Sequence, residues 1–251
     1  MEIDLTEPLA AAKAAHFDAD SGACDYAALQ SSPERGRIAA CLAELESVDP
    51  QRIAIPAQTA FWLNVFNAVV LRDAAELAAA PNLRAAAAFF ERPRLKVGPF
   101  GYSLDDIEHG LLRGNVPKFG ARRPPMQRDD PRLAHMPLAY DERMHFGVYS
   151  VSRSSPPLNA FSAGRLDAEL EDATVRYLRQ HVRVENDGAV VVLPRQFQWY
   201  AADFGGERNA VTFAVSRLDD ETVDRVDSRR GRVKVRYAEF DWRPNGYAPS
   251  G

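Results

Sequence analysis

The sequence YSLDDIEHGLLR concentrates residue types that can carry acid–base chemistry. Ser103 and Asp106 have the spacing of a capping box, which predicts that a helix starts here. On such a helix His109 follows Asp105 by four residues, close enough for the carboxylate to orient the imidazole. Glu108 adds a further acid, and clustered titratable groups are typical of functional sites. The alternative is a surface helix whose acids favour its positive end and whose histidine has no chemical role.

A second group of reactive side chains lies in HFGVYSVSRSSPPLNAFS, residues 145–162. The β-prone residues that follow His145 predict a short strand. The strand is expected to end at a serine-rich turn, because Pro156 and Pro157 have no amide hydrogens to donate. Hydroxyl groups and Arg153 therefore follow a rigid element directly, which is a common place for a site.

Two asparagines interrupt a strongly apolar helix predicted over residues 57–80. Asn64 and Asn67 are three residues apart and so project from one face of it. A buried amide without partners costs about 1–3 kcal/mol, so polar groups must meet them. Either they bind the backbone of a neighbouring loop, or they bind substrate or stabilise an oxyanion.

The elements that position these residues predict an α+β fold, with several helices packed around a small, mainly antiparallel sheet, because strands and helices occur in runs. A turn at Asn186-Asp187-Gly188 gives the clearest hairpin signal. The stretch 114–141 lacks periodicity and is expected to be a long loop. Further helices are expected over residues 8–16, 32–46, 103–113, 163–182 and 211–226 and in a stretch ending at 90, and strands over 95–102, 146–151, 182–194 and 232–242.

Composition favours an ordinary globular protein: 251 residues, of which 46% are hydrophobic and 26% charged. The net charge of −4 argues against nucleic acid as a partner. No run approaches the ~20 apolar residues of a membrane span, and the start lacks the features of a secretory signal, so no membrane partner and a cytoplasmic location are expected. Cys24 and Cys41 are interpreted as plain thiols.

Six phrases taken together resemble the family of domain of unknown function 547, in order over residues 25–246. They are DYAAL, AFWLNVFNAVVL, YSLDDIEHGLLR, the HF…SRSSPP segment, LPRQFQWYAADFGG and FDWRPNG. The resemblance implies an N-terminal helical extension over residues 1–24, a single domain over 25–246 and a loose tail over 247–251. It also implies that the site residues are Trp62, Asn64, Asn67, Ser103, Asp105, Asp106, Glu108, His109, His145, Ser154, Pro156 and Pro157.

The chain departs from the family pattern, which typically reads HFALNCxxxSCPP. Tyr149, Ser150 and Ser155 stand in place of the asparagine and the two cysteines. A thiolate is a much better nucleophile near neutral pH than an unassisted hydroxyl. Three explanations follow: the cysteines are structural, Ser155 replaces a nucleophilic cysteine, or this copy has lost the reaction.

The first functional hypothesis is a hydrolase or an acyl or amide transferase acting on a small molecule or peptide. Ser155 is its nucleophile, His109 or His145 its base, and Asp105 or Glu108 the orienting acid. The substrate-binding candidates are Asn64, Asn67, Trp62, Arg153 and Ser154.

A catalytically inactive binding or accessory protein is the alternative to this enzyme. A metal-dependent hydrolase that uses the same acids and histidines is the third hypothesis, although the spacing matches no metal signature and no cofactor is expected. A papain-like or transglutaminase-like core would suit a family with a thiol, a histidine and an acid. No oligomeric state is predicted.

Overall fold

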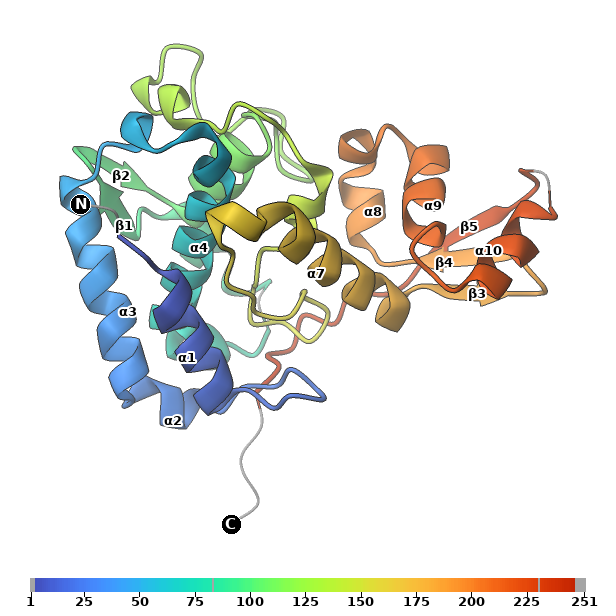
Figure 1. The fold of residues 1–251 in the computed structure, drawn as a ribbon, viewed down its shortest axis with the longest axis horizontal. Helices are drawn as coiled ribbons and strands as arrows, with labels where there is room; N and C mark the ends of the chain where they lie inside the picture. Colours follow the sequence, from blue (N-terminus) through green and yellow to red (C-terminus); the bar gives the residue numbers. More distant parts are fainter. Residues whose placement is uncertain (1–2, 83, 230, 247–251) are drawn as a thin grey trace. The chain divides into compact units, whose positions relative to one another are not determined.

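The computed structural model describes residues 3–82, 84–229 and 231–246. Its helices and two small sheets form an α+β protein, which confirms the predicted fold class (Figure 1). Contacts divide the chain into a first unit, residues 1–170 with 242–251, and a second unit, residues 171–241. The predicted tail, residues 247–251, lies outside the described residues. The N-terminal extension expected over residues 1–24 and the single domain expected over 25–246 remain predictions.

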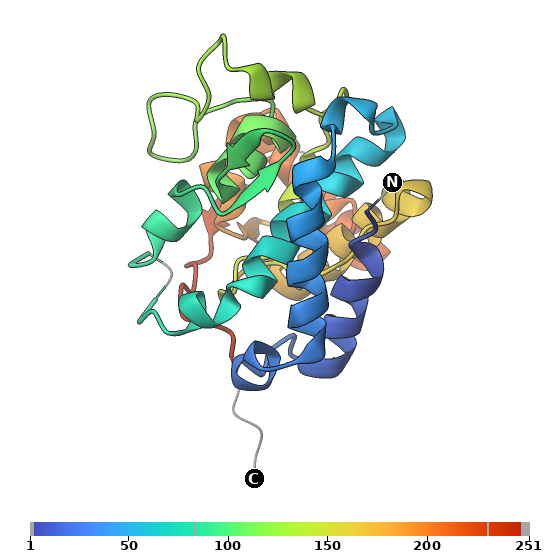
Figure 2. The ribbon, with the colours of Figure 1, turned by 90° about the vertical axis from the view of Figure 1, so that its left-hand side faces the viewer.

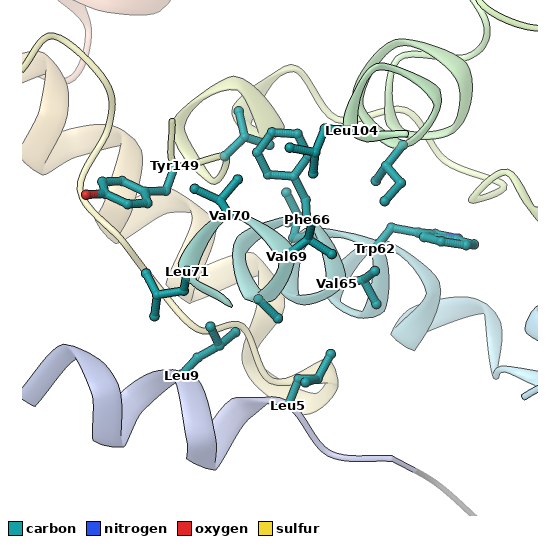
Figure 3. Packing of buried hydrophobic residues seen from close by; sticks show 14 of the residues in the cluster. Leu5, Leu9, Trp62, Val65, Phe66, Val69, Val70, Leu71, Leu104 and Tyr149 are labelled. Carbon is teal, nitrogen blue, oxygen red and sulfur yellow. The ribbon is translucent and has the colours of Figure 1, made fainter. Parts of the chain in front are cut away.

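Helix α4, Ile55–Arg72, is the buried centre of the first unit. Pro56 fits its first turn, where backbone amides have no acceptor within the helix. Every residue from Trp62 to Leu71 is buried, and apolar side chains project from all sides of the helix. Figure 3 shows Leu5 and Leu9 packed on one side of α4 and Leu104 on another.

Several short helices surround α4 in the first unit. Figures 1 and 2 show α1 and α3 side by side. Ser32 caps α3 by accepting a hydrogen bond from Arg35 N, and Pro33 fits its first turn. The α-helices are α1 Thr6–His16, α2 Tyr26–Gln30, α3 Pro33–Glu44, α5 Ala74–Ala78 and α6 Ala87–Glu91. Single-turn 3₁₀-helices are Leu45–Ser47, Pro50–Arg52, Pro131–His135, Glu142–Phe146 and Ala163–Arg165.

The strand and turn expected over residues 95–102 are an antiparallel hairpin of β1, Leu95–Val97, and β2, Phe100–Tyr102, which precedes the helix that starts at Ser103. Gly98 makes its turn with a φ of 56°, and a Cβ there would lie 2.9 Å from the Val48 carbonyl oxygen. Only glycine fits this turn, because both the backbone angle and the close approach exclude a side chain.

The second unit contains a three-stranded sheet in the order β3-β4-β5. β3, Arg183–Glu185, and β4, Val190–Leu193, form the predicted hairpin, whose turn residues 186–188 all have positive φ. β5, Lys234–Tyr237, pairs parallel to β4. The helical elements are the C-terminal part of α7 (Leu166–His181), α8 Gln196–Trp199, the 3₁₀-helix Ala201–Phe204, α9 Glu207–Val215 and α10 Asp220–Asp227.

Three sequence-based expectations about elements are wrong. The segment 146–151 is not a strand, since His145 and Phe146 belong to a 3₁₀-helix and residues 147–151 join no strand ladder. The helix expected over 57–80 ends at Arg72, and α5 follows Asp73. The helix expected over 211–226 is two helices, because Asp219 caps a new one by accepting from Thr222 N.

No helix of the part that the structure describes is long and apolar enough to cross a membrane.

Candidate functional site

Ser103 and Asp106 make the capping box that the sequence predicts. Ser103 N donates to Asp106 Oδ2 at 2.9 Å, and Asp106 N donates to Ser103 Oγ at 3.0 Å. The helix then widens into a π-helix over Asp106–Leu112, with Arg113 N donating to the Glu108 carbonyl at 2.9 Å. Short π-helical segments are rare and are frequent at functional sites. The acidic helix therefore has a geometry that its sequence did not reveal.

His109 is 4% exposed and lies beside three charged side chains of its own helix. Arg113 Nη1 lies 3.2 Å from His109 Nδ1, and because a guanidinium can only donate, Nδ1 accepts. The hydrogen of the neutral imidazole is then on Nε2, which faces Asp105 Oδ1 at 3.8 Å. Glu108 Oε1 is 3.7 Å from Nδ1. Asp105 thus lies next to the Nε2 edge of the ring, at a distance longer than a hydrogen bond.

Asp105 is held on its other side by a lysine that sequence reasoning did not select. Lys118 Nζ lies 2.6 Å from Asp105 Oδ2 and 2.7 Å from Glu91 Oε1. Burial raises the pKa of the Asp105 carboxyl, and the hydrogen bond from Lys118 opposes part of that increase. Lys118 belongs to the long loop, where nothing in the sequence relates it to Asp105.

Asn67 is fully buried and binds three backbone groups. Its Nδ2 donates to the carbonyls of Gly147 at 2.9 Å and Asn159 at 3.0 Å, and its Oδ1 accepts from Tyr149 N at 2.9 Å. The side-chain amide of Asn67 therefore connects the start of the segment 147–159, at Gly147 and Tyr149, with its end at Asn159. This is the backbone-binding alternative that the sequence left open.

Asn64 binds the same segment further along. Its Nδ2 donates to the Phe161 carbonyl at 2.7 Å, and its Oδ1 accepts from Phe161 N at 2.9 Å. The side-chain amide pairs with the polar groups of a single residue as a strand partner would. Asn64 and Asn67 together fix the serine-proline segment to α4.

Ser155 lies in a tight turn of that segment and is 9% exposed. Its Oγ lies 2.9 Å from the Ser152 carbonyl oxygen and 3.3 Å from that of Pro156, and its single hydrogen bonds to these acceptors. Within the described residues, no histidine hydrogen-bonds to Ser155 Oγ. The hydroxyl therefore has to leave the Ser152 carbonyl before it can give its proton to a base.

Val151, next to this turn, has a backbone conformation that is unfavourable for a β-branched residue. Its φ is 66°, and its side chain is buried. The C-terminal segment holds the strained position, since Asn245 N donates to the Val151 carbonyl at 2.8 Å and Arg153 N donates to the Arg243 carbonyl at 2.9 Å. Strained backbone of this kind is concentrated at functional sites.

The remaining predicted residues occupy different environments. His145 is buried in the 3₁₀-helix Glu142–Phe146, while Ser154 is half-buried and Arg153 exposed. Trp62 is buried on α4, where its Nε1 donates to the His135 carbonyl at 2.9 Å. His145, Ser154 and Arg153 precede the proline pair in one segment, and Trp62 lies elsewhere.

His135 is a buried histidine that sequence reasoning passed over. Its Nδ1 hydrogen-bonds to the Tyr102 hydroxyl, and its ring lies 5.6 Å from the ring of Phe100. Burial lowers the pKa of His135, which favours the neutral ring. Its position in the long loop gave no periodic signal that could have identified it.

A cleft of about 770 Å³ opens in the first unit beside Asn64 and Phe161. Its wall includes the carboxylates of Asp4 and Asp49 and the apolar ring of Phe61. The volume is in the range of small-molecule sites. Ser155 and the π-helix are not among the residues that line it.

Among the described residues, no three His, Cys, Asp or Glu side chains form a group that could hold a metal ion.

The fold and these contacts define an α+β protein with a buried acid–histidine pair on a π-helix and a serine-proline turn that two asparagines fix to α4. A family model described as "Protein of unknown function, DUF547" matches residues 50–178, which is more than half of the chain. The chain belongs to the DUF547 family. The match covers α4, the π-helix and the serine-proline turn. Comparison with curated proteins and with solved structures found no match.

Proposed function

We propose that the protein is a hydrolase or an acyl or amide transferase that acts on a small molecule or a peptide. The observation that carries the proposal is the buried pair of Asp105 and His109 on the π-helix. A carboxylate that faces the N–H of a neutral imidazole is the arrangement that orients a general base. Burial of both side chains and the raised pKa of the Asp105 carboxyl support the same conclusion, because perturbed titratable groups gather at sites.

In the proposed reaction Ser155 Oγ attacks a carbonyl carbon of the substrate and loses its proton to the base. His109 takes that proton on Nδ1, so Arg113 has to release this atom when the reaction begins. Asp105 stabilises the imidazolium. The proton then passes to the leaving group, and water or a second nucleophile releases the acyl group from Ser155. His145 is the other candidate base, and Glu108 the other candidate acid.

Five further residues act on the substrate or on the position of the turn. Arg153 is exposed and offers a guanidinium to a substrate carboxylate or carbonyl, and Ser154 lies beside it. Asn64 and Asn67 position the serine-proline segment through backbone hydrogen bonds. Trp62 is a buried residue of α4, the helix that also carries Asn64 and Asn67.

A fluorophosphonate probe, which phosphonylates activated serines with loss of fluoride, tests the proposal on the purified protein. We expect labelling that is lost in Ser155→Ala and in His109→Gln and kept in Ser152→Ala, the matched control from the same turn. Labelling of Ser155→Ala at the wild-type rate would exclude Ser155 as nucleophile. Absence of labelling in the wild-type protein would support the second function.

The second candidate function is a binding or accessory protein without catalysis. It is favoured by the hydrogen bond between Ser155 Oγ and the Ser152 carbonyl, at a position where the family pattern has a thiol. A metabolite or peptide that raises the melting temperature without being converted would support this function. Turnover of that ligand, abolished in His109→Gln, would contradict it.

A metal-dependent hydrolase is the third hypothesis from the sequence. Elemental analysis of protein purified without chelators tests it. A stoichiometric metal ion would replace the serine mechanism, and a metal-free protein that still reacts with the probe would eliminate the metal mechanism.

A further inference from the structure

The outer edge of β5 in the second unit has unpaired backbone groups. β5 pairs with β4 on one side, where Lys234 N donates to the Ala189 carbonyl and Ala238 N to the Leu193 carbonyl. Backbone groups of successive residues in a strand point to opposite edges, so Val235 and Tyr237 present theirs outward. Among the described residues, none hydrogen-bonds to the N–H groups of Val235 or Tyr237.

Side chains along this edge differ between the two faces of the sheet. Lys234 and Arg236 are exposed on one face, while Val235 and Tyr237 are half-buried on the other. Arg236 makes an ion pair with Glu185 of β3 on the charged face, and Lys234 makes none with a described residue. A strand added here would meet Lys234 and the paired Arg236 on one face, and on the other Val235 and the ring of Tyr237, whose hydroxyl donates to Glu207.

We propose that the outer edge of β5 binds an extended peptide in which acidic and apolar residues alternate. Main-chain hydrogen bonds to Val235 and Tyr237 supply the affinity of such strand addition, and side chains at alternate positions supply the specificity. Acidic side chains on the charged face pair with Lys234 and Arg236, and apolar ones contact Val235 and Tyr237.

A second copy of this chain does not fit the same edge. Pairing of β5 with β5 would bring Lys234 and Arg236 of both copies onto the same face, and like charges on adjacent strands destabilise pairing. Charged edge residues thus exclude self-association while they favour an acidic partner. This interaction is independent of the proposed serine chemistry.

Fluorescence polarisation of labelled peptides with the whole protein tests the proposal. The probes are three capped peptides of about six residues. The first alternates Glu and Val, and the second alternates Lys and Val. The third has the same Glu and Val content as the first, but all its Glu residues precede all its Val residues. We expect the alternating acidic peptide to bind at least about tenfold more tightly than either control. Equal binding of all three, or no binding of the acidic peptide at about 1 mM, would overturn the proposal.

Two kinds of variant separate the backbone contribution from the charge contribution. Val235→Pro removes an outward N–H that takes no part in the β4 ladder, and proline is tolerated at such positions. Val235→Pro should weaken binding of the acidic peptide at least about tenfold. Val235→Thr, which keeps the N–H, should change the affinity less than about twofold. Circular dichroism confirms folding of each variant.

Charge reversal tests the same edge without a change to the backbone. Lys234→Glu should weaken binding of the acidic peptide about three- to tenfold. Arg128→Glu, an exposed loop residue in the first unit, makes the same change in net charge and should have little effect. Lys234→Glu combined with Arg236→Glu should reverse the preference toward the Lys-Val peptide. Unchanged preference in a folded double variant would overturn the proposal.

Discussion

Asn64 and Asn67 on α4 and His109 on the π-helix are all buried polar groups, but their contacts differ. The two asparagines make five hydrogen bonds of 2.7–3.0 Å, all to backbone atoms of one segment. The contacts of His109 with its helix neighbours are 3.2–3.8 Å long and involve charged side chains. The asparagines fix a backbone position, whereas the histidine is surrounded by groups that respond to its protonation.

The difference also lies in what each group can do. An amide neither gains nor loses a proton near neutral pH, so a fully bonded asparagine can only position other atoms. An imidazole can take up and release a proton, and Asp105 and Arg113 place opposite charges beside His109. Changes to the asparagines should therefore affect stability most, and changes to the π-helix should affect chemistry most.

Asn67→Leu should give the largest loss of stability. It removes three hydrogen bonds at a site with no exposure and leaves two carbonyls and one N–H without partners. We expect the free energy of unfolding to fall by about 4 kcal/mol, measured by urea denaturation. Gln51→Leu, at an exposed amide, is the control and should change it little. A loss below about 1 kcal/mol would mean that other contacts hold the segment.

Asn64→Leu should have a smaller effect because only two hydrogen bonds, both to Phe161, are lost. We expect a decrease of about 2–3 kcal/mol in the same measurement. Thr6→Val is a matched comparison, since Thr6 Oγ1 reaches the same Phe161 carbonyl at 3.4 Å. It should cost less than about 1 kcal/mol. Equal losses in both variants would contradict the assignment of Asn64 as the main partner of Phe161.

These contacts explain why the sequence predicts some elements and misses others. Local signals were sufficient for the capping box at Ser103 and the hairpin at residues 186–188, because each depends on residues close in sequence. The strand expected over 146–151 has the correct side chains but no neighbouring strand. Asn67 binds Gly147 and Tyr149 in place of a ladder, a long-range contact that periodicity cannot reveal.

The candidate site was predictable to a similar extent. The spacing of Asp105 and His109 identified their proximity, since it depends on one helix. Lys118 reaches Asp105 from the long loop, and Arg113 lies four residues after His109, yet neither contact follows from residue type alone. Gly110 of the π-helix packs closely against Met126 of the same loop, since a Cβ at Gly110 would lie 2.9 Å from Met126 Cε, and this long-range contact has no signal in the local sequence.

His109→Gln should separate chemistry from stability. Glutamine retains an acceptor for Arg113 and fills much of the same volume, so the free energy of unfolding should fall by less than about 1 kcal/mol. Probe labelling of Ser155 should be lost. A loss of stability as large as that of Asn67→Leu, with labelling retained, would show that His109 is part of the scaffold and reverse the comparison.

Asp105→Asn should produce the smallest effect, visible in the pH dependence of stability. Burial raises the folded pKa of this carboxyl above its unfolded value of 3.8, so between these values the folded state binds more protons. The contribution of Asp105 to stability therefore falls as pH rises through that interval, and Asp105→Asn should remove this fall. In Lys118→Met the interval should extend to higher pH, because the lysine hydrogen bond lowers the pKa of Asp105. Urea denaturation at a series of pH values measures both effects. Identical pH profiles for wild type and Asp105→Asn would mean that this carboxyl titrates alike in the folded and unfolded chains, and would remove desolvation of Asp105 as support for its role beside His109.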